Sequence, residues 1–214
     1  MIRLENFSFS YQQNEIFRDV NLQISLERPV LIRGVNGSGK TTLARILCGL
    51  QKDFTGNILL DNQAISKFSK TEFASKMLYI KQETEQNFVA ATLQEDLQVW
   101  QQGFSKEHNE QAKRMRFRIF QNLNLDKIAN SLIWKLSGGQ RKRGSLAPLW
   151  LSNKKIWLLD EPTAGLDVDS IEILLNKITR GKNRVIIFSN RNAVFEELMP
   201  LELHLLDKKI IRIF

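Results

Sequence analysis

A glycine-rich segment near the start of the chain combines the groups that hold a chain of phosphates. Residues 34–42 read Gly-Val-Asn-Gly-Ser-Gly-Lys-Thr-Thr and satisfy the phosphate-loop pattern. The glycines let backbone N–H groups turn inward to phosphate oxygens, Lys40 supplies a point charge to the β- and γ-phosphates, and the Thr41 hydroxyl can bind Mg²⁺. The predicted nucleotide-binding residues of this segment are Asn36, Gly37, Ser38, Gly39, Lys40, Thr41 and Thr42.

An acidic pair follows the apolar run at residues 156–159. We assign Asp160 to hold Mg²⁺ through water and Glu161 to polarise an attacking water, as phosphoryl transfer requires. Alone, such a pair is explained equally well as a strand-end turn with solvated carboxylates. Its place after a phosphate loop favours phosphoryl transfer, with Glu161 as the catalytic group and Thr41 and Asp160 at the metal.

The apolar pattern predicts the elements that position these groups. Residues 30–32 form a short apolar strand that runs into the loop, and residues 40–50 turn helical, which gives a strand–loop–helix unit. Residues 156–160 and 185–189 are continuous apolar strands, typical of a parallel sheet covered on both faces, and a helix at 169–179 connects them. Both chemical segments therefore follow predicted core strands.

Other segments complete an α/β chain. Residues 2–9 alternate apolar and polar side chains and residues 16–26 read similarly, which predicts an antiparallel sheet. Residues 83–145 lack strong β signals and contain a helix-rich stretch at 93–122, which we interpret as an inserted helical lobe. The tail at 203–213 is predicted to form a hairpin. Pro148 lies where a helix would continue, and we expect it to kink or end that helix.

Length and composition narrow the class of protein. The 214 residues fit one α/β domain with one inserted lobe, and no apolar run approaches the roughly 20 residues of a membrane-spanning helix. The start of the chain lacks the layout of a secretory signal, and the single cysteine, Cys48, has no partner for a disulfide, so we expect a cytoplasmic location. The net charge of +8 comes from scattered basic residues, so we favour solvated surface and expect no nucleic-acid partner.

A third motif identifies the family. Residues 136–140 read Leu-Ser-Gly-Gly-Gln, a glycine-opened helix start that resembles the ABC signature motif. Gln82 follows a predicted strand at 78–81, where ABC ATPases have their Q-loop, and residues 164–167 (Ala-Gly-Leu-Asp) are similar to the D-loop. Tyr11 lies where the family carries an aromatic side chain that stacks on adenine. The resemblance covers essentially the whole chain, with the motifs in the expected order.

The resemblance implies a P-loop NTPase (RecA-like) core at 1–82 and 146–214, an antiparallel β sheet at the start, and an α-helical subdomain at about 83–145, all within one ABC ATPase domain. It implies ATP and Mg²⁺ as cofactors, with Gln82 at the metal and in catalysis. The phosphate loop and the signature each offer one anion-binding face, so two domains stacked head to tail can enclose ATP. The further nucleotide-binding residues implied are Tyr11, Ser137, Gly138, Gly139, Gln140 and Asp167.

The Q-loop region resembles one branch of the family more closely. Residues 82–96 look like the corresponding region of energy-coupling-factor and cobalt-type importers, where it faces a membrane partner. The sequence departs from that branch at Glu83 and Thr84, where the family usually has Asn-Pro, so a generic ABC Q-loop stays open. The implied role is that of an ATPase subunit at the cytoplasmic face of the membrane. It would bind transmembrane permease subunits and power the uptake of a vitamin or metal ion.

The position of the switch histidine departs from the family. ABC ATPases usually follow the last core strand with Ser or Thr and then His, whereas Asn190 stands here. Its amide can donate one hydrogen bond to phosphate but cannot carry positive charge, and we assign neither His108 nor His204 to this role by position. We therefore expect slow ATP hydrolysis. The alternatives are a nucleotide-gated module with little turnover, another ABC transporter class, or a soluble ABC protein; homodimers and heterodimers both stay open.

Overall fold

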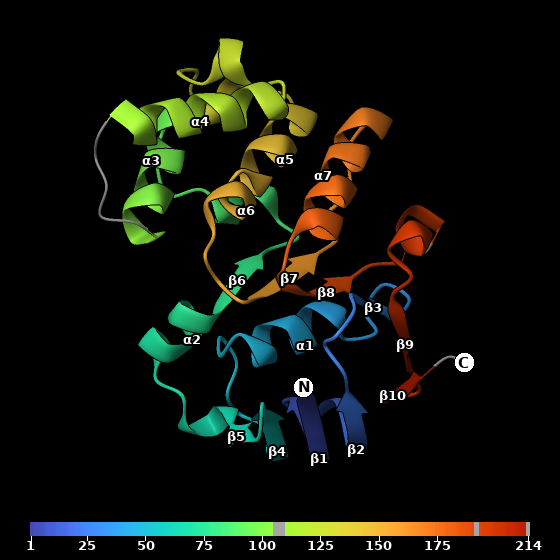
Figure 1. The fold of residues 1–214 in the computed structure, drawn as a ribbon. Coiled ribbons are helices and arrows are strands. Elements are labelled where there is room, and N and C mark those ends of the chain that lie inside the picture. The colour runs from blue at the N-terminus through green and yellow to red at the C-terminus, as the bar shows by residue number, and fades with distance from the viewer. Residues whose placement is uncertain (105–109, 191–192, 213–214) are drawn as a thin grey trace. The chain divides into compact units, whose positions relative to one another are not determined.

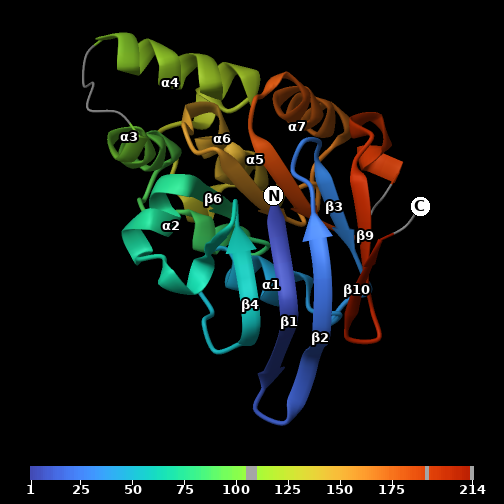
Figure 2. The same cartoon turned by 60° about the horizontal axis from the view of Figure 1, so that its bottom comes forward.

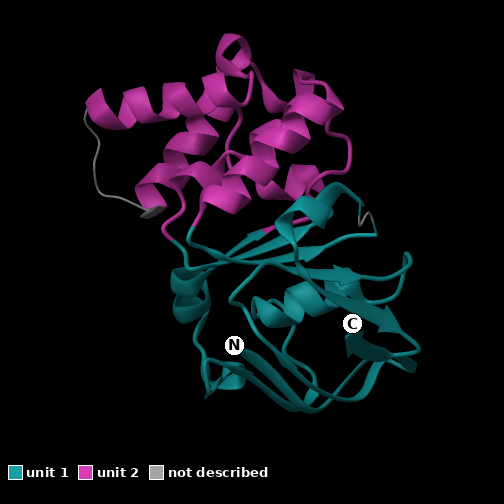
Figure 3. Ribbon diagram, turned by 45° about the vertical axis from the view of Figure 1, so that its right-hand side comes forward, with its two compact units in different colours: residues 1–79, 154–161, 182–214 teal, residues 80–153, 162–181 magenta. Residues whose placement is uncertain are grey.

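The computed structural model describes residues 1–104, 110–190 and 193–212. The chain divides into two compact units, each assembled from separate segments (Figure 3). Unit 1 contains residues 1–79, 154–161 and 182–214, and unit 2 contains residues 80–153 and 162–181. The division into a core and a helical subdomain at about 83–145 stays a prediction from the sequence.

Unit 1 contains two β sheets with the helix α1 (Lys40–Leu47) between them (Figures 1 and 2). The first is a four-stranded sheet in the order β2-β1-β4-β5, and the second is a six-stranded sheet in the order β10-β9-β3-β8-β7-β6. The strands of the first sheet are β1 (Ile2–Tyr11), β2 (Asn14–Ile24), β4 (Thr55–Leu60) and β5 (Gln63–Ala64). Those of the second are β3 (Val30–Arg33), β6 (Met77–Ile80), β7 (Ile156–Asp160), β8 (Arg184–Phe188), β9 (Leu201–Leu206) and β10 (Lys209–Arg212).

The remaining short elements of unit 1 were not anticipated from the sequence. They are the helix α2 (Lys70–Lys76) and the 3₁₀ turns η1 (Ile65–Lys67) and η5 (Ala193–Leu198). Helix α2 begins with a capping box, in which the Ser69 hydroxyl accepts from the Glu72 backbone N–H at 3.2 Å while the Glu72 carboxylate accepts from the Ser69 N–H at 2.7 Å. These reciprocal bonds fix the start of a helix that is only two turns long.

A bulge in β1 explains why its apolar residues change phase. Ile2 and Leu4 are buried on alternate positions, and Phe7 and Phe9 are again buried on alternate positions. One extra residue between Leu4 and Phe7 shifts the phase of the alternation. Asn6 takes up the shift with a positive φ of 48°, and its N–H donates to the side-chain oxygen of Asn21 at 2.8 Å. Both pairs of apolar side chains therefore reach the same core cluster.

The centre of the six-stranded sheet is parallel and buried, as the continuous apolar runs predict. β3 pairs with β8, and β8 with β7, all in the same direction. Parallel strands end at one edge of a sheet, so the residues that follow β3, β7 and β8 are brought to that edge. The phosphate loop follows β3, the acidic pair lies at the end of β7, and Ser189 with Asn190 follows β8.

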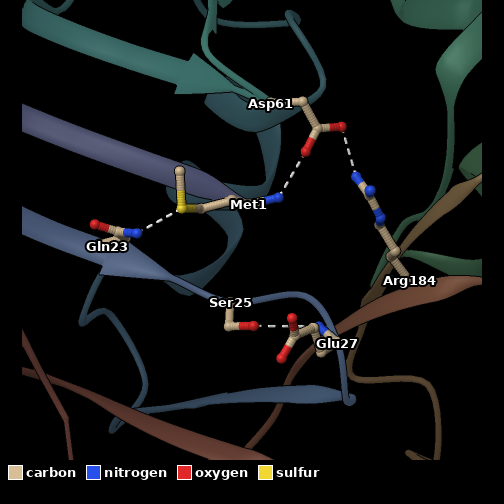
Figure 4. A network of polar contacts seen from close by, with 6 residues as sticks. All are labelled: Met1, Gln23, Ser25, Glu27, Asp61 and Arg184. Atoms are coloured by element: carbon tan, nitrogen blue, oxygen red, sulfur yellow. Dashed lines mark hydrogen bonds and ion pairs between the residues drawn. The ribbon is translucent and has the colours of Figure 1, made fainter.

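The first residues of the chain are fastened by a small polar network in unit 1 (Figure 4). The Met1 ammonium donates to Asp61 at 2.7 Å, and the Arg184 guanidinium donates to the other oxygen of Asp61 at 2.6 Å. Partial burial acts to raise the pKa of Asp61, but the hydrogen bonds from these two cations outweigh it and lower that pKa. Asp61 therefore ties β1 and β8 to the turn between β4 and β5.

Unit 2 is helical in the residues described. Its helices are α3 (Leu93–Phe104), α4 (Glu110–Asn122), α5 (Gly138–Leu146), α6 (Pro148–Leu151) and α7 (Val168–Arg180), with the 3₁₀ turns η2 (Thr84–Asn87), η3 (Asp126–Ile128) and η4 (Ile133–Lys135). The predicted helix-rich stretch at 93–122 is thus two helices. Leu97, Phe120 and Leu125 are among the buried side chains of the core that these elements share.

Pro148 ends one helix and begins the next. Helix α5 stops at Leu146, and Pro148 is the first residue of α6, where a missing N–H costs nothing. The prediction that this proline interrupts the helix is confirmed. Among the helices that the structure describes, none is long and apolar enough to cross a membrane.

Gly56 gives a test of the bulge in β1. It has φ of 79°, and an added Cβ would lie 2.2 Å from the backbone oxygen of Asn6. We predict that Gly56→Ala lowers the free energy of unfolding by about 2–3 kcal/mol, because both the left-handed backbone and the clash oppose a side chain. The measurement is chemical denaturation monitored by circular dichroism.

Gly103→Ala is the matched control, because Gly103 lies in α3 with no described atom within 4 Å of an added Cβ. It should leave stability unchanged or raise it by up to about 1 kcal/mol, since alanine favours a helix. Equal effects of the two substitutions would show that the bulge does not require glycine.

Candidate functional site

The phosphate loop joins β3 to α1 and is shaped by its glycines. Gly39 precedes the helix with φ of 101°, and an added Cβ would lie 2.6 Å from the side chain of Ile16. The Ser38 N–H donates to the Val35 oxygen at 3.1 Å, which closes the turn. The N-terminus of α1 thus lies where the sequence predicts phosphate binding.

Lys40 is buried and held inside this loop. Its ammonium donates to the Gly34 oxygen at 2.7 Å and to the Val35 oxygen at 3.2 Å. Carbonyl oxygens hold a buried ammonium less strongly than an anion would, so the charge is available to phosphate oxygens. Asn36 and Gly37 are exposed in the same loop, and Thr41 and Thr42 are half-buried in the first turn of α1.

Asp160 ends β7 as a fully buried carboxylate. The hydroxyl of Tyr79 donates to its Oδ2 at 3.1 Å, whereas its Oδ1 has no hydrogen-bond partner among the described residues. Burial raises the pKa of Asp160, against the lowering effect of hydrogen bonds from Thr41 and Tyr79. Burial and the neighbouring charge of Asp160 also raise the pKa of Tyr79, which keeps the phenol a donor.

Glu161 is the next residue and has the more constrained backbone. It adopts a positive φ of 44°, and its N–H donates to the Phe188 oxygen at 2.8 Å. A non-glycine residue in this region is strained, and such strain clusters at functional sites. The carboxylate accepts from the Ser189 hydroxyl at 2.8 Å and the Asn190 backbone N–H at 3.2 Å, and its Oε1 lies 3.9 Å from the Lys40 ammonium.

Asn190 contacts Glu161 through its backbone N–H and is also one of the residues that line a cleft. The cleft has a volume of about 610 Å³, and its wall includes residues 34–36 of the phosphate loop and His204. Nε2 of His204 is buried without a hydrogen-bond partner among the described residues and lies 3.9 Å from the Glu202 carboxylate. His204 is therefore closer to the predicted switch position than its place in the tail suggested; His108 falls outside the described residues.

The residues of unit 1 fit the metal that the resemblance to ABC ATPases implies. Mg²⁺ prefers oxygen ligands and keeps several of its waters, so one carboxylate and one hydroxyl beside a phosphate site are sufficient protein ligands. Asp160 Oδ1 is a buried acceptor without a partner among the described residues, and the Thr41 hydroxyl belongs to the same cluster. Both residues were predicted for this role.

The signature segment begins α5 in unit 2 with its own capping box. The Ser137 hydroxyl accepts from the Gln140 N–H at 3.2 Å, and the Gln140 side chain accepts from the Ser137 N–H at 2.8 Å. Gly138 and Gly139 form the first turn, and an added Cβ at Gly138 would meet no described atom within 4 Å. The cap orients the serine and leaves the glycine backbone open.

The D-loop lies beside the signature helix within unit 2. Arg143 of α5 reaches the Asp167 carboxylate at 3.3 Å, and an added Cβ at Gly139 would lie 3.5 Å from the Gly165 oxygen. Asp167 caps α7 by accepting from the Ser170 N–H at 2.8 Å. The hydrogen bonds from Ser170, with a smaller effect of Arg143, lower the pKa of Asp167. The two predicted motifs of this unit are therefore brought together.

Gln82 is exposed near the start of unit 2, next to Lys81, whose backbone is held by hydrogen bonds. The side chain of Asn87 accepts from the Lys81 N–H at 2.8 Å and donates to the Lys81 oxygen at 2.9 Å. Farther along the same segment, Val89 is 65% exposed and its N–H donates to the buried Asp96 at 2.7 Å. The region thus presents an apolar side chain on a backbone that is held in place.

Tyr11 ends β1 as an exposed aromatic residue. Its ring contacts that of Phe9 edge to face, with ring centres 4.7 Å apart.

Two side chains that contact Asp160 and Glu161, those of Tyr79 and Ser189, are not assigned from the sequence. Ser189 has a signal, the Ser or Thr that precedes the switch position in the family, but Tyr79 has none beyond its place in a strand.

The sequence of this chain is similar to that of known ABC transporter proteins. A family model described as ABC transporter matches residues 17–164. The energy-coupling factor transporter ATP-binding protein EcfA of Onion yellows phytoplasma is 32% identical over 199 residues, which cover 91% of this chain and 72% of that protein. The cytochrome c biogenesis ATP-binding export protein CcmA of Xanthomonas axonopodis pv. citri is 32% identical over 179 residues, covering 84% and 80%.

Other relatives differ in length, and the fold has a close structural match. The chain spans about a third of the length of three other curated relatives that it matches. The dimeric structure of MJ0796, a bacterial ABC transporter cassette, has a TM-score of 0.84 at 24% identity over 99% of this chain and 97% of that one. The predicted P-loop NTPase fold with an antiparallel sheet and a helical insert is confirmed. Because the family match spans more than half of the sequence, the chain belongs to the ABC transporter family.

Proposed function

We propose that this chain binds ATP with Mg²⁺ and hydrolyses it slowly, as the energising subunit of a membrane importer of the energy-coupling-factor type. The observation that carries the proposal is the convergence of Lys40, Asp160 and Glu161 at one edge of the sheet in unit 1. An ammonium that donates to two loop carbonyls beside Glu161, a carboxylate oxygen without a partner among the described residues and a strained glutamate are the groups that phosphoryl transfer uses.

Each of these residues has a distinct role in the proposed reaction. Lys40 exchanges its loop carbonyls for phosphate oxygens, and Thr41 and Asp160 hold the metal. Bound Mg²⁺ supplies positive charge to the phosphate oxygens. Glu161 keeps lone pairs beyond those engaged by Ser189 and Asn190, and with them it orients and polarises the attacking water.

A second copy or a related ATPase subunit would complete the site. The Ser137 cap and the open turn at Gly138 and Gly139 form an anion-binding face at a helix start. In a head-to-tail dimer this face closes over ATP bound to the phosphate loop of the partner. Tyr11, Gln140 and Asp167 join the nucleotide site of such a dimer, and Gln82 joins the metal site.

The direction of transport is supported by one segment of the sequence and by the name of a relative. Residues 82–96 resemble the Q-loop region of importers, and EcfA is by name an energy-coupling factor protein. CcmA is by name an export protein, so a role in another ABC transporter class is the alternative. The exposed Val89 suits an apolar contact with a transmembrane permease at the cytoplasmic face of the membrane.

A nucleotide-gated module with little turnover is the second candidate. It is favoured by Asn190, which contacts Glu161 only through a backbone N–H in the described contacts. An amide side chain cannot supply the charge of the family's histidine at this position.

Lys40→Ala tests nucleotide binding. We predict that it weakens ATP affinity at least about tenfold, because it removes a charge-assisted hydrogen bond to phosphate. Isothermal titration calorimetry with ATP measures the loss. Lys113→Ala is the control, since Lys113 is an exposed lysine on α4 paired with Glu110. Equal affinities for wild type and Lys40→Ala would refute phosphate binding by this loop.

Asn190→His tests the slow-turnover proposal. We predict a rise in ATP turnover, up to about 10²-fold, because an imidazole restores a preorganised donor, while Glu161→Gln removes the residual activity. A phosphate-release assay, with the membrane partner present where possible, measures both. Wild-type turnover equal to or above that of Asn190→His would show that the asparagine is no handicap.

His204→Gln tests whether His204 takes the role of the switch histidine, whose position Asn190 occupies. We predict unchanged turnover, because Nε2 of His204 lies beside Glu202 rather than Glu161. A loss of activity in the same phosphate-release assay would instead assign the role of the switch histidine to His204.

Purification from native membranes tests the transport assignment. We expect a transmembrane protein at near-equal stoichiometry when the tagged chain is isolated in mild detergent and its partners are identified by mass spectrometry. Recovery with ribosomes or DNA in place of a membrane protein would contradict the proposal.

A further inference from the structure

Tyr79 is bonded to the carboxylate that the proposed function places at the metal. Its hydroxyl donates to Asp160 Oδ2 at 3.1 Å. The other oxygen, Oδ1, is buried and has no hydrogen-bond partner among the described residues. The two oxygens of one carboxylate are therefore in different situations, one engaged by a phenol and one left open.

The ring of Tyr79 is held firmly enough to direct its hydroxyl. Tyr79 is the third residue of β6 and is half-buried, and its ring packs against the core cluster between the two sheets of unit 1. A tyrosine has only two rotatable side-chain bonds, so a packed ring fixes the position of its oxygen closely. The hydrogen bond then restricts rotation of the Asp160 carboxylate about the Cβ–Cγ bond.

Positioning of this kind has a known chemical effect. Ligands of metal ions are themselves held by hydrogen bonds from neighbouring groups, and loss of such a partner typically weakens metal binding or activity by about 10–100-fold. A buried tyrosine hydroxyl also needs a partner for stability alone. That simpler explanation predicts an effect on unfolding and none on the response to a divalent cation.

We propose that Tyr79 is a positioning residue for the divalent cation that accompanies the nucleotide. By occupying Oδ2 of Asp160, it presents Oδ1 to the cation or to a water bound to it. The inference rests on the proposed ATP-binding function, because only a nucleotide site gives Asp160 a cation to hold.

The test measures the cation requirement of nucleotide binding. A fluorescent ATP analogue is bound to the whole chain first in EDTA and then at rising concentrations of Mg²⁺, with Mn²⁺ as a second probe. In Tyr79→Phe we expect unchanged affinity for the analogue in EDTA and a Mg²⁺ concentration at half-saturation raised by about 10–100-fold. The phenyl ring preserves the packing, so the change is confined to the hydroxyl.

Ser75→Ala is the matched control. Its hydroxyl donates to the Glu72 oxygen at 2.8 Å on α2, so this variant also loses one hydroxyl and one hydrogen bond. It should have the Mg²⁺ requirement of the wild type. The Asp160→Asn background supplies a second check, because a residue that acts through Asp160 should have no further effect once the carboxylate is gone.

The outcomes distinguish this inference from the function on which it rests. Should wild type and Tyr79→Phe bind the analogue with the same Mg²⁺ requirement, the positioning role is overturned while nucleotide binding stands. Additive effects of Tyr79→Phe and Asp160→Asn would overturn it as well. If even the wild type fails to bind the analogue, the proposed function fails and the inference falls with it.

Where Tyr79→Phe does not stay folded by circular dichroism, Tyr79→His takes its place, since it keeps an aromatic ring with an N–H donor. A Mg²⁺ requirement closer to that of the wild type than to that of Asp160→Asn supports the role of the donor. A requirement equal to that of Asp160→Asn overturns it.

Discussion

The placement of the Lys40 ammonium beside Glu161 is the constraint on which the rest of the structure depends. The two charges lie 3.9 Å apart and both residues are buried, at 7% and 8% exposure. Buried charges are costly unless they are paired and hydrogen-bonded, and here the Gly34 and Val35 carbonyls hold the lysine while Ser189 and Asn190 hold the glutamate. Each of these partners comes from a strand end, so the parallel register of β3, β7 and β8 is what keeps the cluster satisfied.

The sheet supplies this register because its strands are apolar on both faces. Leu158 and Ile186 are fully buried neighbours in the core between the two sheets, and a slip of one strand would remove them from that core. The same register sets Glu161 against the Phe188 oxygen, which fixes the left-handed backbone of the glutamate. The same strand register therefore sets both the packing of the core and the strained backbone of Glu161.

The sequence was sufficient for the fold class and the family because both depend on local patterns. Glycine spacing, apolar runs and the signature segment can each be recognised within about ten residues of sequence. The phase change of β1 and the short elements at 55–76 could not be predicted in this way, because the bulge at Asn6 depends on the partners Asn21 and Gly56. The role of Tyr79 could not be predicted for the same reason, because its bond to Asp160 spans 81 residues and forms only when β6 and β7 lie in one sheet. The assigned roles of the site residues stay predictions.

A crystal structure of the chain with Mg²⁺ and a non-hydrolysable ATP analogue tests the central claim most directly. The account predicts that the triphosphate lies at the N-terminus of α1, that the Lys40 ammonium has left the Gly34 and Val35 oxygens for phosphate oxygens, and that Asp160 Oδ1 faces the cation. A triphosphate bound elsewhere, with Lys40 still bonded to the two carbonyls, would contradict it.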